Sequence, residues 1–166
     1  MSVRRTRVMA AAAGLLPLVL ALAAPATARA QSMEEKDVVA VIEKFFAGML
    51  ARDTAMMRTT FDPAGRLVAI AQPREGQPTV RATTMDQFLA GIARGTGEGA
   101  NERIHSPEVR IDGNLATVWT FYTLHVGERF IHCGYDAFQL LRLPEGWKIV
   151  SVADTRRTTG CEVGGE

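Results

Sequence analysis

The chain has 166 residues, with 19 lysines and arginines against 18 aspartates and glutamates, which gives a formal net charge of +1. Four of the arginines and none of the acids lie in the first 30 residues, so the other 136 residues carry 15 basic and 18 acidic groups, or −3. That balance, without a basic cluster, lacks the electrostatic footprint of a nucleic-acid-binding protein. A chain of this length makes one ordinary domain with a core of its own.

Residues 1–30 have the three parts of a secretory signal peptide. Arg4, Arg5 and Arg7 form a basic start, residues 9–24 are rich in Ala and Leu, and Ala28-Arg29-Ala30 is a small-x-small cleavage pattern. The alternative is a membrane anchor, but two prolines interrupt the apolar run, which is shorter than the ~20 residues that cross a bilayer. We expect cleavage after Ala30, a periplasmic or secreted product, and no membrane span in the mature form.

The first half of the mature sequence predicts helices. From the capping-box serine Ser32, apolar residues recur at helical spacing to about Arg52. The residues of this apolar face are Val38, Val41, Ile42, Phe45, Phe46 and Met49. Asp53 can cap a second short helix, and a second capping box at Thr84 opens a third. Between them, residues 67–71 predict a short strand and residues 72–82 a hairpin or loop.

From Asn101 onward the apolar period changes from helical to strand-like. Four strands are predicted, over residues 104–111, 115–126, 129–143 and 147–155. Gly127-Glu128 has the form of a two-residue hairpin turn. Helices followed by a meander of antiparallel strands predict an α+β domain with the helices on one face of the sheet.

The order of these elements resembles the nuclear transport factor 2-like superfamily, which includes ketosteroid isomerase and the SnoaL-like polyketide cyclases. The stretches VVAVIEKFFAGMLARD, DAFQLLRL and GWKIVSVADT are typical of the group, and HCGYDAF (residues 132–138) resembles a secreted bacterial subgroup without an assigned reaction. The resemblance implies that residues 31–166 form one cone-shaped domain, in which a curved antiparallel (mixed) sheet wraps around the N-terminal helices. It also implies an apolar pocket between the sheet and the first helix, and commonly a homodimer through the sheets.

Cys133 and Cys161 are the two cysteines of the chain. In an oxidising compartment a lone pair most simply forms one disulfide, the alternatives being a metal site or a nucleophilic thiol.

Strand parity sorts the residues of the last three strands into two faces, if Gly127-Glu128 is a simple two-residue turn. The first face holds Trp119, Phe121, Thr123, His125, Phe130, His132, Asp136, Phe138, Trp147, Ile149, Ser151 and Ala153. The second holds Val118, Tyr122, Leu124, Ile131, Cys133, Tyr135, Ala137, Val150, Val152, Asp154 and Arg156. Similarity to ketosteroid isomerase around GWKI favours the second face as the pocket lining, but one bulge near Gly134 would reverse part of the assignment.

Asp154 and Arg156 lie two residues apart and hence on one face. Arg156 could hold an anionic ligand while Asp154 acts as a base, or the two could form a salt bridge at the sheet margin. Tyr122 and Tyr135 could donate hydrogen bonds to a ligand carbonyl, or could be core tyrosines with a wet hydroxyl. Phe45, Met49 and Trp119 complete the predicted binding residues.

His132 and Asp136 are the other catalytic candidates, although four residues along one extended strand separate them too far for direct contact. His125 lies diagonally from His132, but no recognised ligand spacing accompanies this pair, so we expect no metal. We also expect no cofactor, because GTGEGA lacks the Lys-Ser/Thr of a phosphate-binding loop. The aspartate base of ketosteroid isomerase corresponds here to Gln72, and an amide cannot accept a substrate proton, so that chemistry is not expected.

The sequence therefore predicts an exported domain that binds a small, largely apolar molecule, with acid–base chemistry of the lyase, cyclase or isomerase type as an option. The alternative is a non-catalytic dimerisation or accessory module of the periplasm. The sequence does not decide whether the domain is an enzyme.

Overall fold

The structure is a computed structural model that describes residues 26–71 and 76–162. Its elements follow the order α1 (Ala26–Ala51), α2 (Thr54–Thr60), β1 (Phe61–Ala71), β2 (Thr79–Thr84), α3 (Met85–Arg94), β3 (Ala100–Asp112), β4 (Leu115–Val126), β5 (Arg129–Leu143) and β6 (Gly146–Arg156). The strands form one sheet in the order β2-β1-β6-β5-β4-β3. The β1–β6 pair is parallel and the other neighbours are antiparallel.

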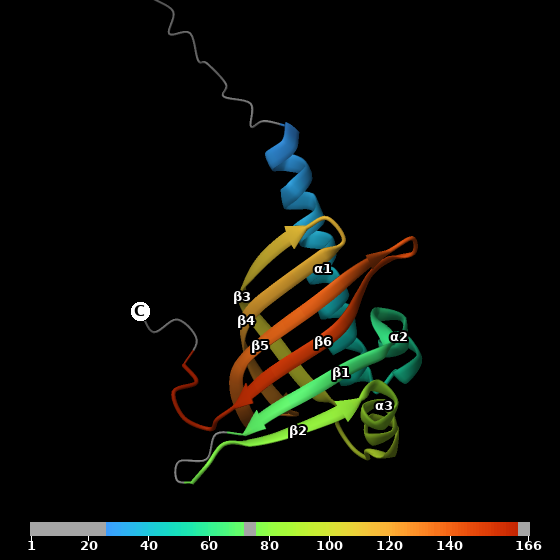
Figure 1. The fold of residues 1–166 in the computed structure, drawn as a ribbon. Helices are drawn as coiled ribbons and strands as arrows, with labels where there is room; N and C mark the ends of the chain where they lie inside the picture. Colours follow the sequence, from blue (N-terminus) through green and yellow to red (C-terminus); the bar gives the residue numbers. More distant parts are fainter. Residues whose placement is uncertain (1–25, 72–75, 163–166) are drawn as a thin grey trace, which may run out of the picture.

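The sheet curves around α1, and α2 and α3 lie beside β1 and β2 (Figure 1). This is the predicted α+β architecture, a mixed curved sheet wrapped around N-terminal helices, and the prediction is confirmed. No helix in residues 26–71 or 76–162 has the length and apolar character needed to span a bilayer.

The apolar face predicted for the first helix forms the centre of the core. Val38, Ile42, Phe45, Phe46 and Met49 are all buried. They belong to one core cluster with buried residues of the sheet, namely Phe61, Ala116, Val118, Phe138, Leu140, Trp147, Ile149 and Val152. Burying an aliphatic or aromatic side chain stabilises a fold by about 1.5–3 kcal/mol, so this face is what holds α1 against the sheet.

Two helix starts were predicted from capping boxes, and one is right. Thr84 caps α3: its hydroxyl accepts from the N–H of Gln87, while the Gln87 side chain accepts from the N–H of Thr84. Ser32 does not begin α1, because the helix already runs from Ala26. The alanines before Ser32 favour helix and carry it upstream. Of the predicted signal peptide, residues 1–25 lie outside the described residues.

The C-terminal end of α1 is fixed by Arg52, which has the left-handed φ of 56° that often ends a helix. Its guanidinium donates hydrogen bonds to four carbonyl oxygens at the end of α3 and in the loop after it, those of Ile92, Thr96, Gly97 and Glu98. The glycine-rich stretch before β3 is therefore held around the side chain of Arg52.

The ranges of the strands agree with prediction except at their ends. β1 begins at Phe61 rather than at residue 67, and the hairpin alternative for residues 72–82 is right, because β2 pairs with β1 from Thr79. Residues 72–75 lie outside the described part. The two-residue turn at Gly127-Glu128 is confirmed, since Val126 pairs with Arg129.

The predicted disulfide between Cys133 and Cys161 is present. Two backbone hydrogen bonds between Cys133 and Arg157 run beside it, each 2.9 Å long. Together these links hold the segment after β6 against β5.

Candidate functional site

A cavity of about 190 Å³ lies between the helices and the concave face of the sheet. Its apolar lining comes from Phe45, Phe46, Met49, Leu67, Phe88, Ile92, Ala100, Leu124, Phe138 and Val152. Its polar lining comes from Glu102, Tyr122, His132, Asp136, Asp154 and Arg156. Four strands, β3 to β6, therefore bring six groups that can hold or exchange a proton to an otherwise apolar hollow. Of the predicted binding residues, Phe45, Met49, Tyr122, Asp154 and Arg156 line this cavity.

The remaining predicted residues are placed by an irregularity early in β5. His125 pairs with Phe130, but Leu124 pairs with His132, so Ile131 is an extra residue in the strand. From His132 onward β5 presents the opposite parity to the one predicted. His132 and Asp136 consequently line the cavity, whereas the sequence prediction put them on the other face from Tyr122.

The same bulge moves Tyr135 to the convex face, so its assignment to the pocket face was wrong. Its ring stacks on Trp119 with centroids 5.0 Å apart. Trp119 is 48% exposed. Neither residue lines the cavity, and both belong to the outer surface of the sheet.

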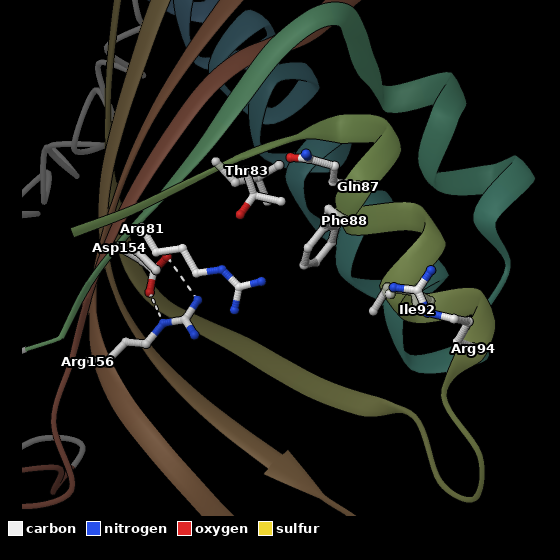
Figure 2. A pocket seen from close by; sticks show the side chains of 11 residues that line it. Arg81, Thr83, Gln87, Phe88, Ile92, Arg94, Asp154 and Arg156 are labelled. Carbon is white, nitrogen blue, oxygen red and sulfur yellow. Dashed lines mark hydrogen bonds and ion pairs between the residues drawn. The ribbon is translucent and has the colours of Figure 1, made fainter. Parts of the chain in front are cut away.

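Asp154 and Arg156 form an ion pair at one end of the cavity (Figure 2). The Arg156 Nε donates to one oxygen of Asp154 at 2.5 Å and an Nη donates to the other at 3.2 Å. Burial by itself lowers the pKa of Arg156, but the hydrogen bond and charge of Asp154 outweigh it and raise that pKa. Arg156 is therefore a permanent cation, with three of its five N–H donors still available.

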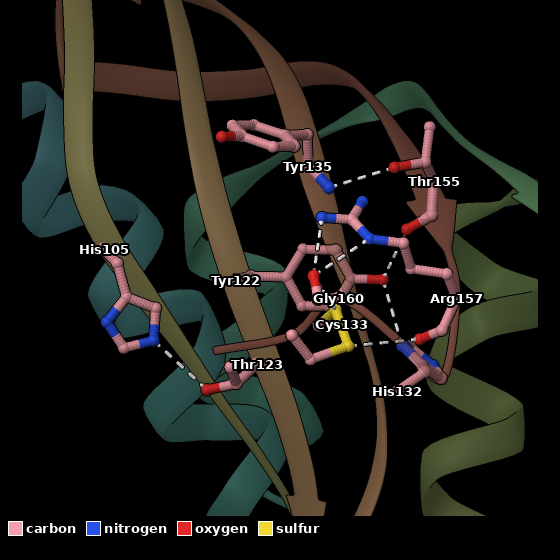
Figure 3. The surroundings of a disulfide bond; sticks show 10 residues. His105, Tyr122, Thr123, His132, Cys133, Tyr135, Thr155, Arg157 and Gly160 are labelled. Atoms are coloured by element: carbon pink, nitrogen blue, oxygen red, sulfur yellow. Dashed lines mark hydrogen bonds between the residues drawn. A yellow bond between two sulfur atoms is a disulfide. The ribbon is translucent and has the colours of Figure 1, made fainter. Parts of the chain in front are cut away.

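Tyr122 on β4 pairs with Gly134 on β5, and its side chain reaches Thr155 on β6 (Figure 3). Its hydroxyl lies 2.9 Å from the carbonyl oxygen of Thr155 and 3.1 Å from Nδ1 of His132. A carbonyl oxygen only accepts, so the single tyrosine hydrogen goes to Thr155, and Nδ1 of His132 must donate to the tyrosine oxygen. Burial and then the charge of Arg156 lower the pKa of His132, so its ring is neutral and Nε2 is left as a proton acceptor.

Glu102 on β3 and Asp136 on β5 place two carboxyl groups on the wall of the cavity, where each influences the pKa of the other. Asp136 is 1% exposed. Within the described residues no donor reaches its Oδ2 atom. Burial, with the charge of Asp154 second, raises the pKa of Glu102 to about 8. Burial and then the charge of Glu102 raise the pKa of Asp136 well above its usual value. Two adjacent carboxylates in an apolar site cannot both ionise, so the pair keeps at least one proton at neutral pH.

Residues 33–153 match the family described as "Putative lumazine-binding". The chain belongs to this family. No curated protein matches it significantly.

Solved structures show that this lumazine-binding-family chain has the fold of nuclear transport factor 2-like proteins, as its sequence resemblance predicted. A protein of unknown function from Nostoc punctiforme, with a cystatin-like fold, is 11% identical over 77% of this chain and 94% of its own, with a TM-score of 0.62. A protein from Streptomyces avermitilis described as a putative dehydratase of the NTF2-like family is 16% identical over 78% and 99%, with a TM-score of 0.61. An NTF2-like superfamily protein from Salmonella enterica is 14% identical over 81% and 99%, with a TM-score of 0.61. At these identities the likeness concerns the fold alone.

The sequence prediction for this family member missed Glu102. The predicted strand began at residue 104, although the alternation of Ala100, Glu102 and Ile104 already places the carboxylate on the apolar face of the longer strand. The signal available in the sequence was an acidic residue at a position where strand alternation expects an apolar one.

The two histidines considered as metal ligands are separated by the bulge. His125 packs against Phe130 on the convex side, 5.5 Å between ring centroids, and His132 faces the cavity. Across residues 26–71 and 76–162, no three or more His, Cys, Asp or Glu side chains are grouped so that they could hold a metal ion.

Proposed function

We propose that this protein is an exported small-molecule-binding domain. Its cavity receives a small, flat, largely apolar molecule that carries a carbonyl or ring nitrogen. The family description suggests lumazine, a two-ring heteroaromatic dione, as the first probe. Export is supported by the leader-like residues 1–30, and the Cys133–Cys161 disulfide supports an oxidising compartment.

Size and lining support a ligand of this kind. The cavity volume of about 190 Å³ is below the roughly 300–1,000 Å³ of pockets for drug-sized ligands. Aromatic rings dominate one wall: Phe45 lies 5.6 Å from Phe46 and 5.9 Å from Phe88 between ring centroids. A planar ring system would pack on these faces, since aromatic pairs add about 0.5–1.5 kcal/mol beyond the area they bury.

The observation that carries the proposal is the position of two carboxyl groups, those of Glu102 and Asp136, on an apolar cavity wall, where burial raises the pKa of both. A carboxyl group that keeps its proton at pH 7 can donate a hydrogen bond to a carbonyl oxygen or ring nitrogen. It can also transfer that proton, while the neutral His132 accepts one from a carbon or nitrogen of the ligand. One proton enters the ligand and one leaves it, so the proposed reaction is an isomerisation or enolisation without another reactant.

Binding is tested by titrating the purified mature protein with lumazine and following the ligand fluorescence. We expect saturable binding that Asp136→Asn weakens about tenfold, because an amide cannot share the proton of Glu102. Glu108→Gln is the matched control, since Glu108 is an exposed acid on the same strand as Glu102. Failure to bind, with a correctly folded protein, would rule out the proposal in this form.

Proton transfer needs a separate test. In D₂O, 2-tetralone should exchange its α-hydrogens faster with the wild-type protein than with His132→Gln or Glu102→Gln, as followed by proton NMR. Equal exchange rates for all three proteins would mean that the domain binds a ligand without catalysing proton transfer.

A second candidate function, homodimerisation, is favoured by the convex face of the sheet. Four of its apolar side chains are exposed: Leu115 by 49%, Trp119 by 48%, Phe130 by 38% and Leu141 by 37%. Sedimentation should then show a dimer at micromolar concentration, which Trp119→Lys converts to a monomer. A monomeric wild-type protein would exclude this function.

A further inference from the structure

A second hollow, the outer pocket, adjoins the ligand cavity. It has a volume of about 250 Å³ and shares five wall residues with the cavity, Leu67, Phe88, Ile92, Asp154 and Arg156. The walls that belong to it alone come from β1, β2 and α3, and include Arg81, Thr83, Gln87 and Arg94. A ligand that fills the inner cavity could therefore extend a substituent into the outer pocket.

The outer pocket is strongly basic. Arg81, Arg94 and Arg156 line it, and Asp154 is its one acidic residue, already bound to Arg156. Figure 2 shows the guanidinium groups of Arg81 and Arg156 pointing toward the same space. Within the part of the chain that the structure describes, neither Arg81 nor Arg94 forms an ion pair with a carboxylate. Three cations against one anion leave a local charge of +2, on a mature domain whose balance is −3.

Neutral donors complete this lining. The Gln87 side-chain oxygen accepts from the backbone N–H of Thr84 at 3.0 Å, which orients the amide and leaves its NH₂ group as a donor. Thr83 presents its side chain to the same space (Figure 2). Guanidinium forks and neutral donors together match the geometry of a carboxylate or phosphate, and charge-assisted hydrogen bonds of this kind are about twice as strong as neutral ones.

We propose that the natural ligand is an amphiphilic anion: its ring system lies in the inner cavity and an acidic substituent lies in the outer pocket, between Arg81 and Arg156. This rests on the proposed binding function and specifies the class of ligand. An uncharged ligand would leave the two guanidinium groups with Asp154 as their single counter-charge, whereas an oxyanion offsets the repulsion that remains.

The test compares three probes that share one ring system: lumazine, lumazine-6-carboxamide and lumazine-6-carboxylate. We expect the carboxylate to bind at least about tenfold more tightly than the amide, as hydrogen bonds to charged groups allow. Salt should weaken binding of the carboxylate probe more than binding of the amide probe, because it screens the charge of the exposed guanidinium groups.

Arg81→Gln should remove most of the advantage of the carboxylate and change amide binding less than twofold. Arg81 is exposed, so the substitution leaves the core intact. Arg110→Gln, an exposed arginine beside a groove on the convex face, is the matched control and should change nothing.

The outcomes separate the two proposals. If lumazine and the amide bind but the carboxylate binds no more tightly, or if Arg81→Gln leaves its advantage unchanged, this inference is overturned and the binding function stands. If none of the three binds, both are overturned.

Discussion

Among single residues, Glu102 and Asp136 differ most from the ordinary behaviour of their type. Their carboxyl groups meet in an apolar cavity, and the charged groups that face them are Asp154 and Arg156 on β6, with the Tyr122 hydroxyl on β4. Burial, the largest influence, raises the pKa of Glu102 to about 8 from 4.5. A group whose pKa is raised on folding makes the folded state bind more protons than the unfolded chain.

This difference predicts how stability changes with pH. Above pH 4.5 the unfolded chain has released the proton of Glu102 that the folded domain still holds, so stability falls as pH rises toward 8. The histidines His105 and His132 have a pKa lowered from 6.5 in the fold, so the unfolded chain still releases some of their protons just above pH 6.5. This release opposes the fall in stability by less than about 1 kcal/mol. We expect the free energy of unfolding to fall by about 1–2 kcal/mol between pH 6.5 and 8.

Urea titrations at pH 6.5 and 8 measure the effect. Glu102→Gln should flatten the pH dependence, while the exposed Glu108→Gln should keep the wild-type slope. A stability that is constant or that rises with pH in the wild-type protein would contradict the raised pKa of Glu102.

Individual residues show how much of the site could be predicted from the sequence. Tyr122, Asp154 and Arg156 obey simple strand parity and line the cavity as the favoured face required. His132, Tyr135 and Asp136 do not, because Ile131 adds one residue to β5 and exchanges the faces after it. The residue types at positions 130–132 do not indicate a bulge, since Phe, Ile and His are all compatible with a regular strand.

At the level of elements, β5 and β6 come unusually close where Tyr122 passes over them. A Cβ atom at Gly134 would lie only 1.7 Å from the carbonyl oxygen of Thr155. That same carbonyl accepts the hydrogen bond of Tyr122. Glycine is therefore required at position 134 by space and not by backbone conformation.

Gly134→Ala should separate the two strands and break the Tyr122–Thr155 hydrogen bond. We expect a loss of about 1–3 kcal/mol in the free energy of unfolding, the usual cost of overpacking a buried site. Gly91→Ala is the control: it lies in α3 with open space around its Cβ position, so it should stabilise by up to about 1 kcal/mol. Equal effects of the two substitutions in thermal unfolding would contradict the close approach.

The elements themselves were largely predictable because their signals are local. Thr84 and Gln87 predict the start of α3, and Gly127-Glu128 predicts the hairpin, each from two residues in contact. The start of α1 was missed because the capping box at Ser32 competes with upstream alanines that also favour helix. The second partner of β1 in the sheet, β6, lies about 85 residues away, and no local pattern specifies such a parallel pairing.

On the scale of the whole molecule, the disulfide joins the end of the chain to the middle of the sheet. It closes a sequence separation of 28 residues between Cys133 and Cys161. The segment it holds also brings Arg157 over the rings of Phe121 and Tyr135, 5.6 and 5.9 Å from their centroids. The bond thus fixes the segment that follows Arg156, at the edge of both pockets.

Reduction of this bond should destabilise the whole domain. In the chain-entropy treatment, a closed loop of this length restricts the unfolded chain by about 3–4 kcal/mol. Urea unfolding with and without dithiothreitol should show a loss of that size, and the double variant Cys133→Ala, Cys161→Ala should be as unstable as the reduced protein and insensitive to dithiothreitol. Non-reducing peptide mapping of exported protein should find the two cysteines linked. Two freely alkylated thiols would show that the disulfide does not form in the exported protein. Unchanged stability on reduction would show that the bond does not stabilise the fold.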